Sequence, residues 1–182
     1  MMDDTLSVLV RPAVLSDLDS LVIGNAALAW ETEQRQLDRT RLRSGVLALL
    51  QDPQKGWYIV AEATTTTSGP RSIVGQLLVT FEWSDWRNGN FWWLQSVYVE
   101  PAYRRKNVFK RLYAYVRKEA ERQQEEICGF RLYVEQENAI AHQSYDRVGF
   151  QEAPYRMYEC ELSSSQFRSP WNSPSGEPAK GD

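Results

Sequence analysis

Apolar and polar residues alternate along residues 6–162 in a pattern that predicts a mixed sheet with helices. Continuously apolar or alternating runs indicate strands, and apolar residues three or four positions apart indicate helices. The predicted strands are 6–12, 57–63, 72–83, 91–100, 130–136 and 155–162. The predicted helices are 16–30, 38–51, 108–124 and 138–148. This order indicates an α/β protein with antiparallel strands early and one βαβ crossover late.

Local signals define several ends of these elements. Ser16 is the expected N-cap of the first helix, and Asp52-Pro53 ends the second helix. The loop TTTTSGPR joins two apolar runs, which predicts that they form an antiparallel hairpin. Pro101 ends the strand that begins at residue 91.

The chain has 182 residues, which is enough for one domain of ordinary size. Its last twenty residues are rich in Ser, Pro and Gly and show no periodicity. We therefore expect a single domain over residues 1–162 and a disordered tail over residues 163–182.

Composition excludes several classes of protein. The net charge of −3 argues against a protein that mainly coats nucleic acid or anionic membranes. No apolar stretch approaches a membrane span, and the first residues lack a signal-peptide pattern. The two cysteines are too few for a disulfide scaffold, so we expect reduced thiols and a cytoplasmic location. A single histidine, His142, gives no basis for a multi-histidine metal site, and we expect no metal.

The most basic stretch of the chain lies where a predicted strand leads through a short loop into a helix. Five cations occur within eight residues: Arg104, Arg105, Lys106, Lys110 and Arg111. Charge alone would suit a solvated helix face. A helix N-terminus also carries unpaired backbone N–H groups and a partial positive charge, so the strand-loop-helix context favours a site for an anion such as a pyrophosphate.

Two motifs in this half of the chain resemble those of the GCN5-related N-acetyltransferase (GNAT) family. The run 104–109, RRKNVF, resembles the family's acetyl-CoA loop, with Asn107 in place of the first glycine and Phe109 in place of a second small residue. Asn is the residue that best tolerates a left-handed backbone after Gly. Further on, NAIAHQSYDRVGF resembles the family's other signature; it supplies Asn138, Ala141, Tyr145, Gly149 and Phe150.

The resemblance implies a GNAT-like acyl-CoA N-acyltransferase fold. Such a fold has a mixed sheet of six to seven strands with about four helices. The strands at 91–100 and 130–136 would be parallel and would splay apart, leaving a slot for the pantetheine arm of acetyl-CoA.

The resemblance also implies which residues bind acetyl-CoA. The strand backbone at Val97, Tyr98 and Val99 would pair with the pantetheine arm. Backbone amides of the loop and first helical turn would hold the pyrophosphate: Arg104, Arg105, Lys106, Asn107, Val108, Phe109 and Lys110. Asn138 would hydrogen-bond the cofactor arm, and Tyr145 would donate a proton to the departing sulfur.

The acceptor of the acetyl group is expected to be a primary amine on a small cationic molecule. Deprotonating an alkylamine of pKa about 10.4 at pH 7 costs roughly 4.6 kcal/mol, so a base is valuable. Trp93 and Gln95 occupy the strand positions where relatives carry a base, and neither can accept a proton usefully. Carboxylates elsewhere are therefore the candidates, with Glu82 and Glu33 favoured as base. The expected substrate-binding residues are Glu31, Glu33, Glu82, Asp85, Trp93 and Gln95.

Other interpretations stay open at this stage. Each of these carboxylates could instead form a surface salt bridge, and the tryptophans could cover the sheet or form a homodimer interface. The chain could be a non-catalytic acyl-CoA-binding or sensing domain, because no strand base is present. An adaptor for nucleic acid or phosphoproteins would use the basic stretch, but the acidic total counts against it.

Overall fold

The computed structural model describes residues 7–64, 71–123, 126–158 and 160. The chain divides into two compact units, Met1–Gly149 and Phe150–Asp182. In the second unit, residues 150–158 and 160 contain no helix or strand. The expected tail over 163–182 lies outside the described residues.

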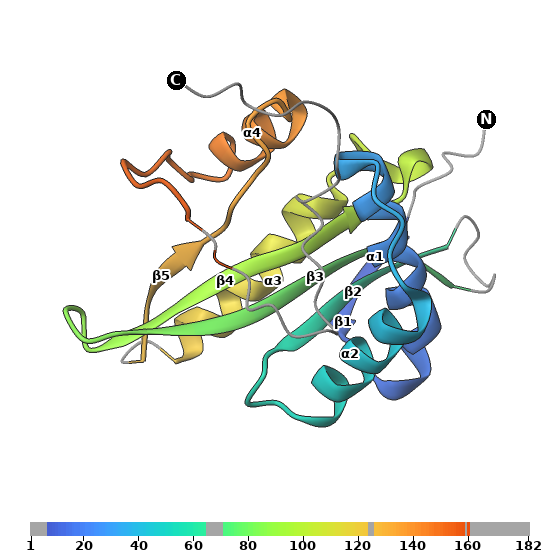
Figure 1. Cartoon of the computed structure of the whole chain (residues 1–182), viewed down its shortest axis with the longest axis horizontal. Coiled ribbons are helices and arrows are strands. Elements are labelled where there is room, and N and C mark those ends of the chain that lie inside the picture. The colour runs from blue at the N-terminus through green and yellow to red at the C-terminus, as the bar shows by residue number, and fades with distance from the viewer. Residues whose placement is uncertain (1–6, 65–70, 124–125, 159, 161–182) are drawn as a thin grey trace, which may run out of the picture. The chain divides into compact units, whose positions relative to one another are not determined.

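The first unit is built on one sheet whose five strands are neighbours in chain order (Figure 1). The strands are β1 (Ser7–Pro12), β2 (Trp57–Thr64), β3 (Ser72–Ser84), β4 (Gly89–Val99) and β5 (Ile127–Arg131). The pairs β1–β2, β2–β3 and β3–β4 are antiparallel, whereas β4–β5 is parallel. The mixed α/β sheet, the β2–β3 hairpin and the late crossover are thus confirmed.

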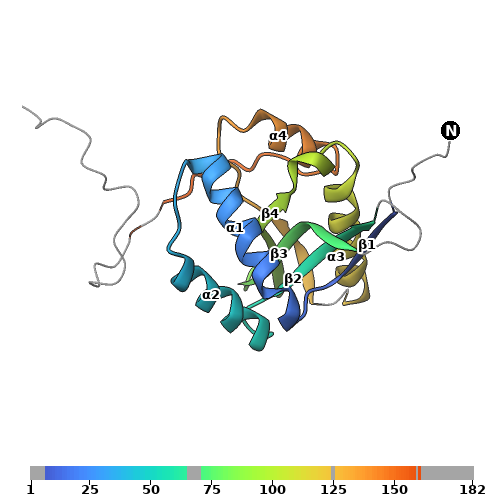
Figure 2. The same cartoon turned by 90° about the vertical axis from the view of Figure 1, so that its right-hand side faces the viewer.

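Helices cover both faces of this sheet (Figure 2). They are α1 (Leu18–Glu33), α2 (Arg39–Gln51), α3 (Val108–Arg122) and α4 (Ala139–Asp146), with short 3-10 turns at Leu15–Asp17 and Pro101–Tyr103. On one face, Leu21 and Val46 pack with Tyr58 and Leu78 in a buried cluster under α1 and α2. On the other face, α3 buries its apolar stripe, which consists of Val108, Leu112, Val116 and Ala120.

The described residues form five strands rather than the expected six or seven. The strand expected over 130–136 ends at Arg131. Residues 155–158 and 160 of the last expected strand are not in a strand, and the rest of that segment lies outside the described residues. Tyr155 and Tyr158 are 79% and 88% exposed. Aromatic residues favour a strand through the neighbours they pack against, so their strand propensity alone does not produce one.

The entry into α1 also differs from the expectation. The 3-10 turn begins at Leu15, and Asp17 rather than Ser16 accepts a hydrogen bond, from the Val14 amide at 2.8 Å. Asp17 is buried and pairs with Arg11 of β1, with Nη1 and Oδ2 2.6 Å apart. The hydrogen bond from Arg11 holds the pKa of Asp17 below its usual range.

β4 is irregular in two respects, its register with β3 and its pairing with β5. Ser96 and Val97 both lie opposite Leu77, because the β3–β4 register shifts between Gln76 and Leu78. Ser96 has a left-handed backbone with φ of 48°.

On its other side, β4 pairs with β5 only as far as Trp93–Arg131, although β4 continues to Val99. The expected parallel strands that splay apart are therefore present. They separate after Arg131, whereas the strand predicted over 130–136 would have continued to residue 136.

Candidate functional site

The fork between β4 and β5 is the first component of the candidate site. Past Trp93, β4 pairs with β3 alone among the described strands; Tyr98 lies opposite Gln76 and Val99 opposite Gly75. One edge of this part of β4 therefore has backbone groups available to an extended ligand. This edge belongs to the residues expected to bind the cofactor arm, Val97, Tyr98 and Val99.

The loop that follows β4 leads directly into α3. Arg105 and Asn107 both have φ of 62°, and Asn107 is the residue at which α3 begins. The substitution of Asn for glycine therefore preserves the left-handed turn. Val108 is buried against β3, where a Cβ on Gly75 would lie 2.9 Å from its Cγ1. The first amides of α3 have no acceptor within the helix and can bind an anion.

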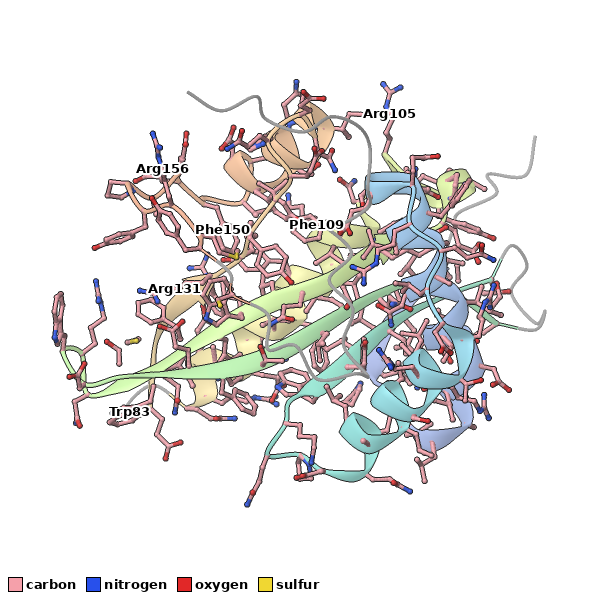
Figure 3. All side chains as sticks on the ribbon, viewed as in Figure 1. Trp83, Arg105, Phe109, Arg131, Phe150 and Arg156 are labelled. Atoms are coloured by element: carbon pink, nitrogen blue, oxygen red, sulfur yellow. The ribbon has the colours of Figure 1, made fainter. Side chains whose placement is uncertain are left out.

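The cations of this loop have different surroundings. Arg104 donates from Nε to the Val99 carbonyl at 2.9 Å and pairs through Nη2 with Glu31 at 2.5 Å. Lys106 Nζ lies 5.4 Å from the centre of the Tyr103 ring, and Arg105 points away from the loop (Figure 3). Arg104 is thus held by protein groups.

Glu31 was expected on the acceptor side, and the structure places it beside the basic loop. Its Oε1 accepts a hydrogen bond from the Tyr98 hydroxyl at 3.4 Å, and its Oε2 pairs with Arg104. Burial, with a smaller effect of Glu31, raises the pKa of Tyr98. This contact joins the last turns of α1 to the loop before α3.

Phe109 and Tyr145 contact each other between α3 and α4. Their ring centres are 5.3 Å apart in an edge-to-face arrangement, and Phe109 also stacks on Tyr113 at 6.3 Å. The Phe109 ring is therefore packed among aromatic rings of α3 and α4. Burial raises the pKa of Tyr145, so its phenol stays a proton donor well above neutral pH.

Asn138 is the N-cap of α4, at the first residue of the helix predicted over 138–148. Its Oδ1 accepts a hydrogen bond from the Ala141 amide at 3.1 Å, which caps the helix. The Nδ2 group has no hydrogen-bond partner within the described ranges and remains available to a ligand. Gly149, with φ of 95°, follows the end of the helix in a conformation that favours glycine.

Three of the expected substrate-binding residues come together on one face of the sheet. Glu82 accepts a hydrogen bond from Trp93 Nε1 on one oxygen and pairs with Arg131 Nη1 on the other, at 2.5 Å. Gln95, two residues along β4 from Trp93, donates to the Thr80 hydroxyl at 2.7 Å. Both carboxylate oxygens of Glu82 are therefore engaged by the protein.

The remaining expected carboxylates lie on other elements. Glu33 is exposed at the end of α1, with Oε2 3.9 Å from Arg35 Nη1. Asp85 is in the turn between β3 and β4, where it accepts a hydrogen bond from the Trp86 amide at 2.9 Å. The structure thus joins Glu82 to Trp93, and places Glu31, Glu33 and Asp85 elsewhere.

A buried polar group near β4 was missed by the sequence reasoning. Asn25 of α1 donates from Nδ2 to the Tyr58 hydroxyl of β2 at 3.0 Å, and both residues line a pocket with Ser96. These three residues come from separate elements. The only sequence signal was a polar residue, Asn25, within the apolar stripe of the first helix.

The described residues combine a mixed sheet with a forked parallel pair, a left-handed turn that leads into α3 and a tyrosine that contacts the first turn of that helix. Residues 24–150 match the sequence model of the Acetyltransferase (GNAT) family. The chain belongs to this family. No curated protein matches the chain.

Solved structures agree with this assignment. A possible acetyltransferase from Clostridium difficile 630 is 43% identical with a TM-score of 0.75, over 86% of this chain and 99% of that one. A predicted acetyltransferase from Clostridium acetobutylicum, crystallised with acetyl-CoA, is 16% identical with a TM-score of 0.67, over 85% and 96%. AAC(6')-Iy, in complex with the bisubstrate analog CoA-S-monomethyl-acetylneamine, is 15% identical with a TM-score of 0.64, over 86% of this chain and 99% of that one. The last two show a shared fold.

Two other kinds of feature are absent from the described residues. Within the described ranges, no helix combines the length and apolar character needed to span a membrane. The same ranges contain no group of three or more His, Cys, Asp or Glu residues placed to hold a metal ion.

Proposed function

We propose that this protein transfers the acetyl group of acetyl-CoA to a primary amine of a small molecule, by direct attack in a ternary complex. The observation that carries the proposal is the contact between Phe109 and Tyr145. It brings a phenol donor next to the first turn of the helix proposed to bind the pyrophosphate, beside the fork between β4 and β5. Family membership supports acetyl transfer as the general reaction.

The proposed reaction forms one bond and breaks one. The amine nitrogen attacks the thioester carbonyl carbon, the C–S bond breaks, and the amine loses a proton while the CoA sulfur gains one. The open edge of β4 would hold the pantetheine arm. Because a thiol has a pKa of about 8.5 and a phenol about 10, Tyr145 would first donate a hydrogen bond to the forming thiolate, with full transfer uphill by about 2 kcal/mol.

Glu82 and Glu33 are the proposed carboxylates for removing the amine proton. Their surroundings give them different expected effects. Glu82 is held by Trp93 and Arg131, so Glu82→Gln would also loosen this cluster. Glu33 is exposed beside Arg35, so Glu33→Gln tests the charge with little structural change.

The test combines cofactor binding with turnover. Acetyl-CoA binding is measured by calorimetry, and release of free thiol is followed with a panel of primary amines. Tyr145→Phe keeps the ring contact with Phe109 and removes only the hydroxyl, so we expect kcat to fall by about 100-fold or more with acetyl-CoA affinity unchanged. Tyr113→Phe is the matched control, because Tyr113 also stacks on Phe109.

Two results would contradict the proposal. An unchanged kcat in Tyr145→Phe would remove this residue from the chemistry. Binding of acetyl-CoA without thiol release for any amine would instead indicate a non-catalytic acyl-CoA-binding protein.

A further inference from the structure

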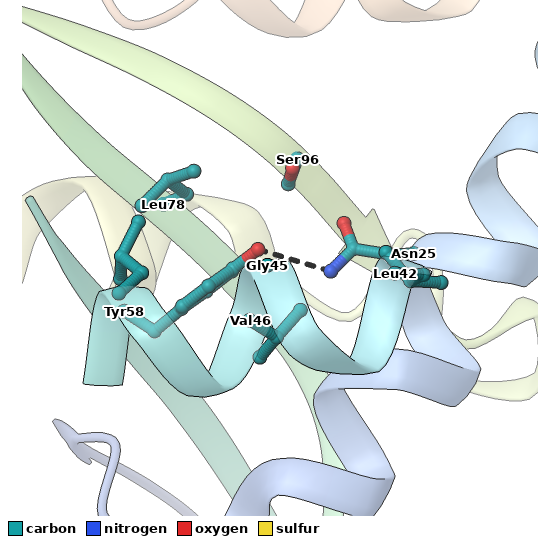
Figure 4. A pocket seen from close by; sticks show the side chains of 8 residues that line it. Asn25, Leu42, Gly45, Val46, Tyr58, Leu78 and Ser96 are labelled. Atoms are coloured by element: carbon teal, nitrogen blue, oxygen red, sulfur yellow. Dashed lines mark hydrogen bonds between the residues drawn. The ribbon is translucent and has the colours of Figure 1, made fainter. Parts of the chain in front are cut away.

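A pocket of about 230 Å³ opens between α2 and the sheet, next to the irregular part of β4 (Figure 4). Five elements contribute to it: α1, α2, β2, β3 and β4. Its lining consists of Asn25, Leu42, Gly45, Val46, Leu49, Tyr58, Leu78 and Ser96. None of these residues belongs to the set expected to bind the cofactor or the acceptor.

The lining is apolar and carries no charged side chain. Leucines, a valine and a glycine form most of the wall, and the polar members are an amide and two hydroxyls. A cationic group entering it would lose hydration without gaining a counter-charge. An apolar cavity of roughly 150 Å³ is large enough to take up benzene, so this pocket can accept a ring or a short alkyl chain.

The amide oxygen of Asn25 is a polar atom on the wall that can interact with a ligand. Asn25, only 6% exposed, uses Nδ2 to donate to the Leu21 carbonyl and to the Tyr58 hydroxyl, each at 3.0 Å. Its Oδ1 has no hydrogen-bond partner in the part of the chain that the structure describes. This oxygen is turned toward the side of the pocket where Ser96 lies (Figure 4).

The pocket also borders the proposed site of acetyl transfer. Ser96, on its wall, is the first residue of the β4 bulge, and Val97 follows it. The backbone of Val97 is in the segment proposed to hold the arm of acetyl-CoA. A molecule that fills the pocket and extends past Ser96 would therefore reach the β4 segment proposed to hold the arm of acetyl-CoA.

We propose that this pocket binds an uncharged apolar substituent of the acceptor amine, while Asn25 Oδ1 accepts a hydrogen bond from the amine nitrogen. The inference rests on the proposed function and names its substrate class: a primary amine joined by a short linker to an alkyl or aromatic group, rather than a polycation. The hydrogen bond to Asn25 uses an N–H and leaves the nitrogen lone pair for attack on the thioester carbonyl.

Gly45 provides a way to fill the pocket without disturbing the core. It lies on the wall within α2, and a Cβ there would meet nothing within 4 Å. Replacing a mid-helix glycine also tends to stabilise the helix. Gly45→Phe would place a ring in the pocket, Gly45→Ala controls for the loss of glycine, and Ala48→Phe controls for a new phenylalanine at an exposed position of the same helix.

The probes are 2-phenylethylamine and spermidine as acceptors, and 2-phenylethanol as a ligand that carries no amine. We expect 2-phenylethylamine to be the better acceptor. Gly45→Phe is expected to raise its KM by roughly 10- to 100-fold and to abolish calorimetric binding of 2-phenylethanol, with acetyl-CoA affinity unchanged. Gly45→Ala and Ala48→Phe should behave like the wild type.

The outcomes separate this inference from the proposed function. If amines are acetylated but Gly45→Phe changes neither KM nor 2-phenylethanol binding, the pocket inference is overturned and the proposed function stands. If 2-phenylethanol fails to bind the wild type, the pocket is a packing gap only and the inference is overturned. If 2-phenylethanol binds and Gly45→Phe blocks it while no amine is acetylated, the proposed function fails and the pocket is supported as a binding site.

Discussion

Gln76 on β3 is a buried polar residue that lowers the stability of the fold. Its side chain is 1% exposed, and its Nε2 has no hydrogen-bond partner among the residues that the structure describes. The Gln76 amide lies directly under α1, where a Cβ on Gly24 would come within 2.3 Å of its Oε1. Glycine at position 24 therefore lets the helix lie close to the sheet above an amide whose burial is costly.

Replacing this amide should stabilise the protein. A buried donor without a partner costs about 1–3 kcal/mol, and methionine has a similar shape without the polar group. We expect Gln76→Met to raise the free energy of unfolding, measured by urea denaturation, by about 1–2 kcal/mol. Gln143→Met on exposed α4 is the control and should leave it unchanged. A lower value for Gln76→Met would mean that the amide is bonded to buried water.

At the scale of elements, the start of α3 depends on the backbone of Asn107. A left-handed conformation costs most non-glycine residues about 1–2 kcal/mol, and β-branched residues are the least suited to it. We expect Asn107→Val to lower both the melting temperature and the affinity for acetyl-CoA, whereas Asn107→Gly retains both. Thermal denaturation and calorimetry measure the two effects. Equal behaviour of the two variants would show that the turn does not control the anion site.

The local end signals of α2 and β4 predicted these ends to within one residue, whereas the signal at the start of α1 did not. Asp38 caps α2 by accepting hydrogen bonds from the Thr40 and Arg41 amides. The helix predicted over 38–51 therefore starts one residue later than expected, at Arg39. The end of β5 at Arg131 was missed because it depends on where β4 turns away, which a single strand does not encode. Asp17, rather than Ser16, organises the start of α1 because Arg11 lies beside it in the fold.

At the scale of the whole molecule, Asp17, Tyr58 and Tyr145 are among the groups whose shifted pKa values make stability depend on pH. Asp17 has its pKa lowered by Arg11, so its contribution is present above about pH 3.9 and is lost as the pH falls through the folded value. Burial raises the pKa of Tyr58 and Tyr145, so their contribution is present below about pH 10 and is lost as the pH rises further. We expect a plateau of stability between these two limits.

Urea denaturation across pH measures this profile. Asp17→Asn should lower the plateau by roughly 1–2 kcal/mol, because it removes one charged partner of Arg11 while Glu62 stays paired with it at 2.5 Å, and should flatten the acid limb. Tyr58→Phe should flatten the alkaline limb. Asp19→Asn is the control, since Asp19 is exposed and pairs with Arg43 at the surface. An acid limb that is unchanged in Asp17→Asn would contradict this account.

The parts of the site that lie close together in the sequence could be predicted, and the parts assembled by the fold could not. Residues 104–109 and 138–149 each form one continuous segment, so their resemblance to the family's motifs could be recognised from the sequence. The pocket joins Asn25, Tyr58 and Ser96, which lie on three elements. Their proximity depends on the packing of α1 over the sheet. The contact of Glu31 with Arg104 likewise joins α1 to a distant loop and could not be predicted from the sequence.

The fork between β4 and β5 would also influence how the protein behaves in solution. Past Trp93, one edge of β4 has no partner among the described strands, and an unpaired strand edge is a template on which a strand of another chain can add. Acetyl-CoA bound along this edge, as proposed, would block that addition. Bound cofactor would then reduce aggregation. A preparation from which CoA has been removed would self-associate on storage.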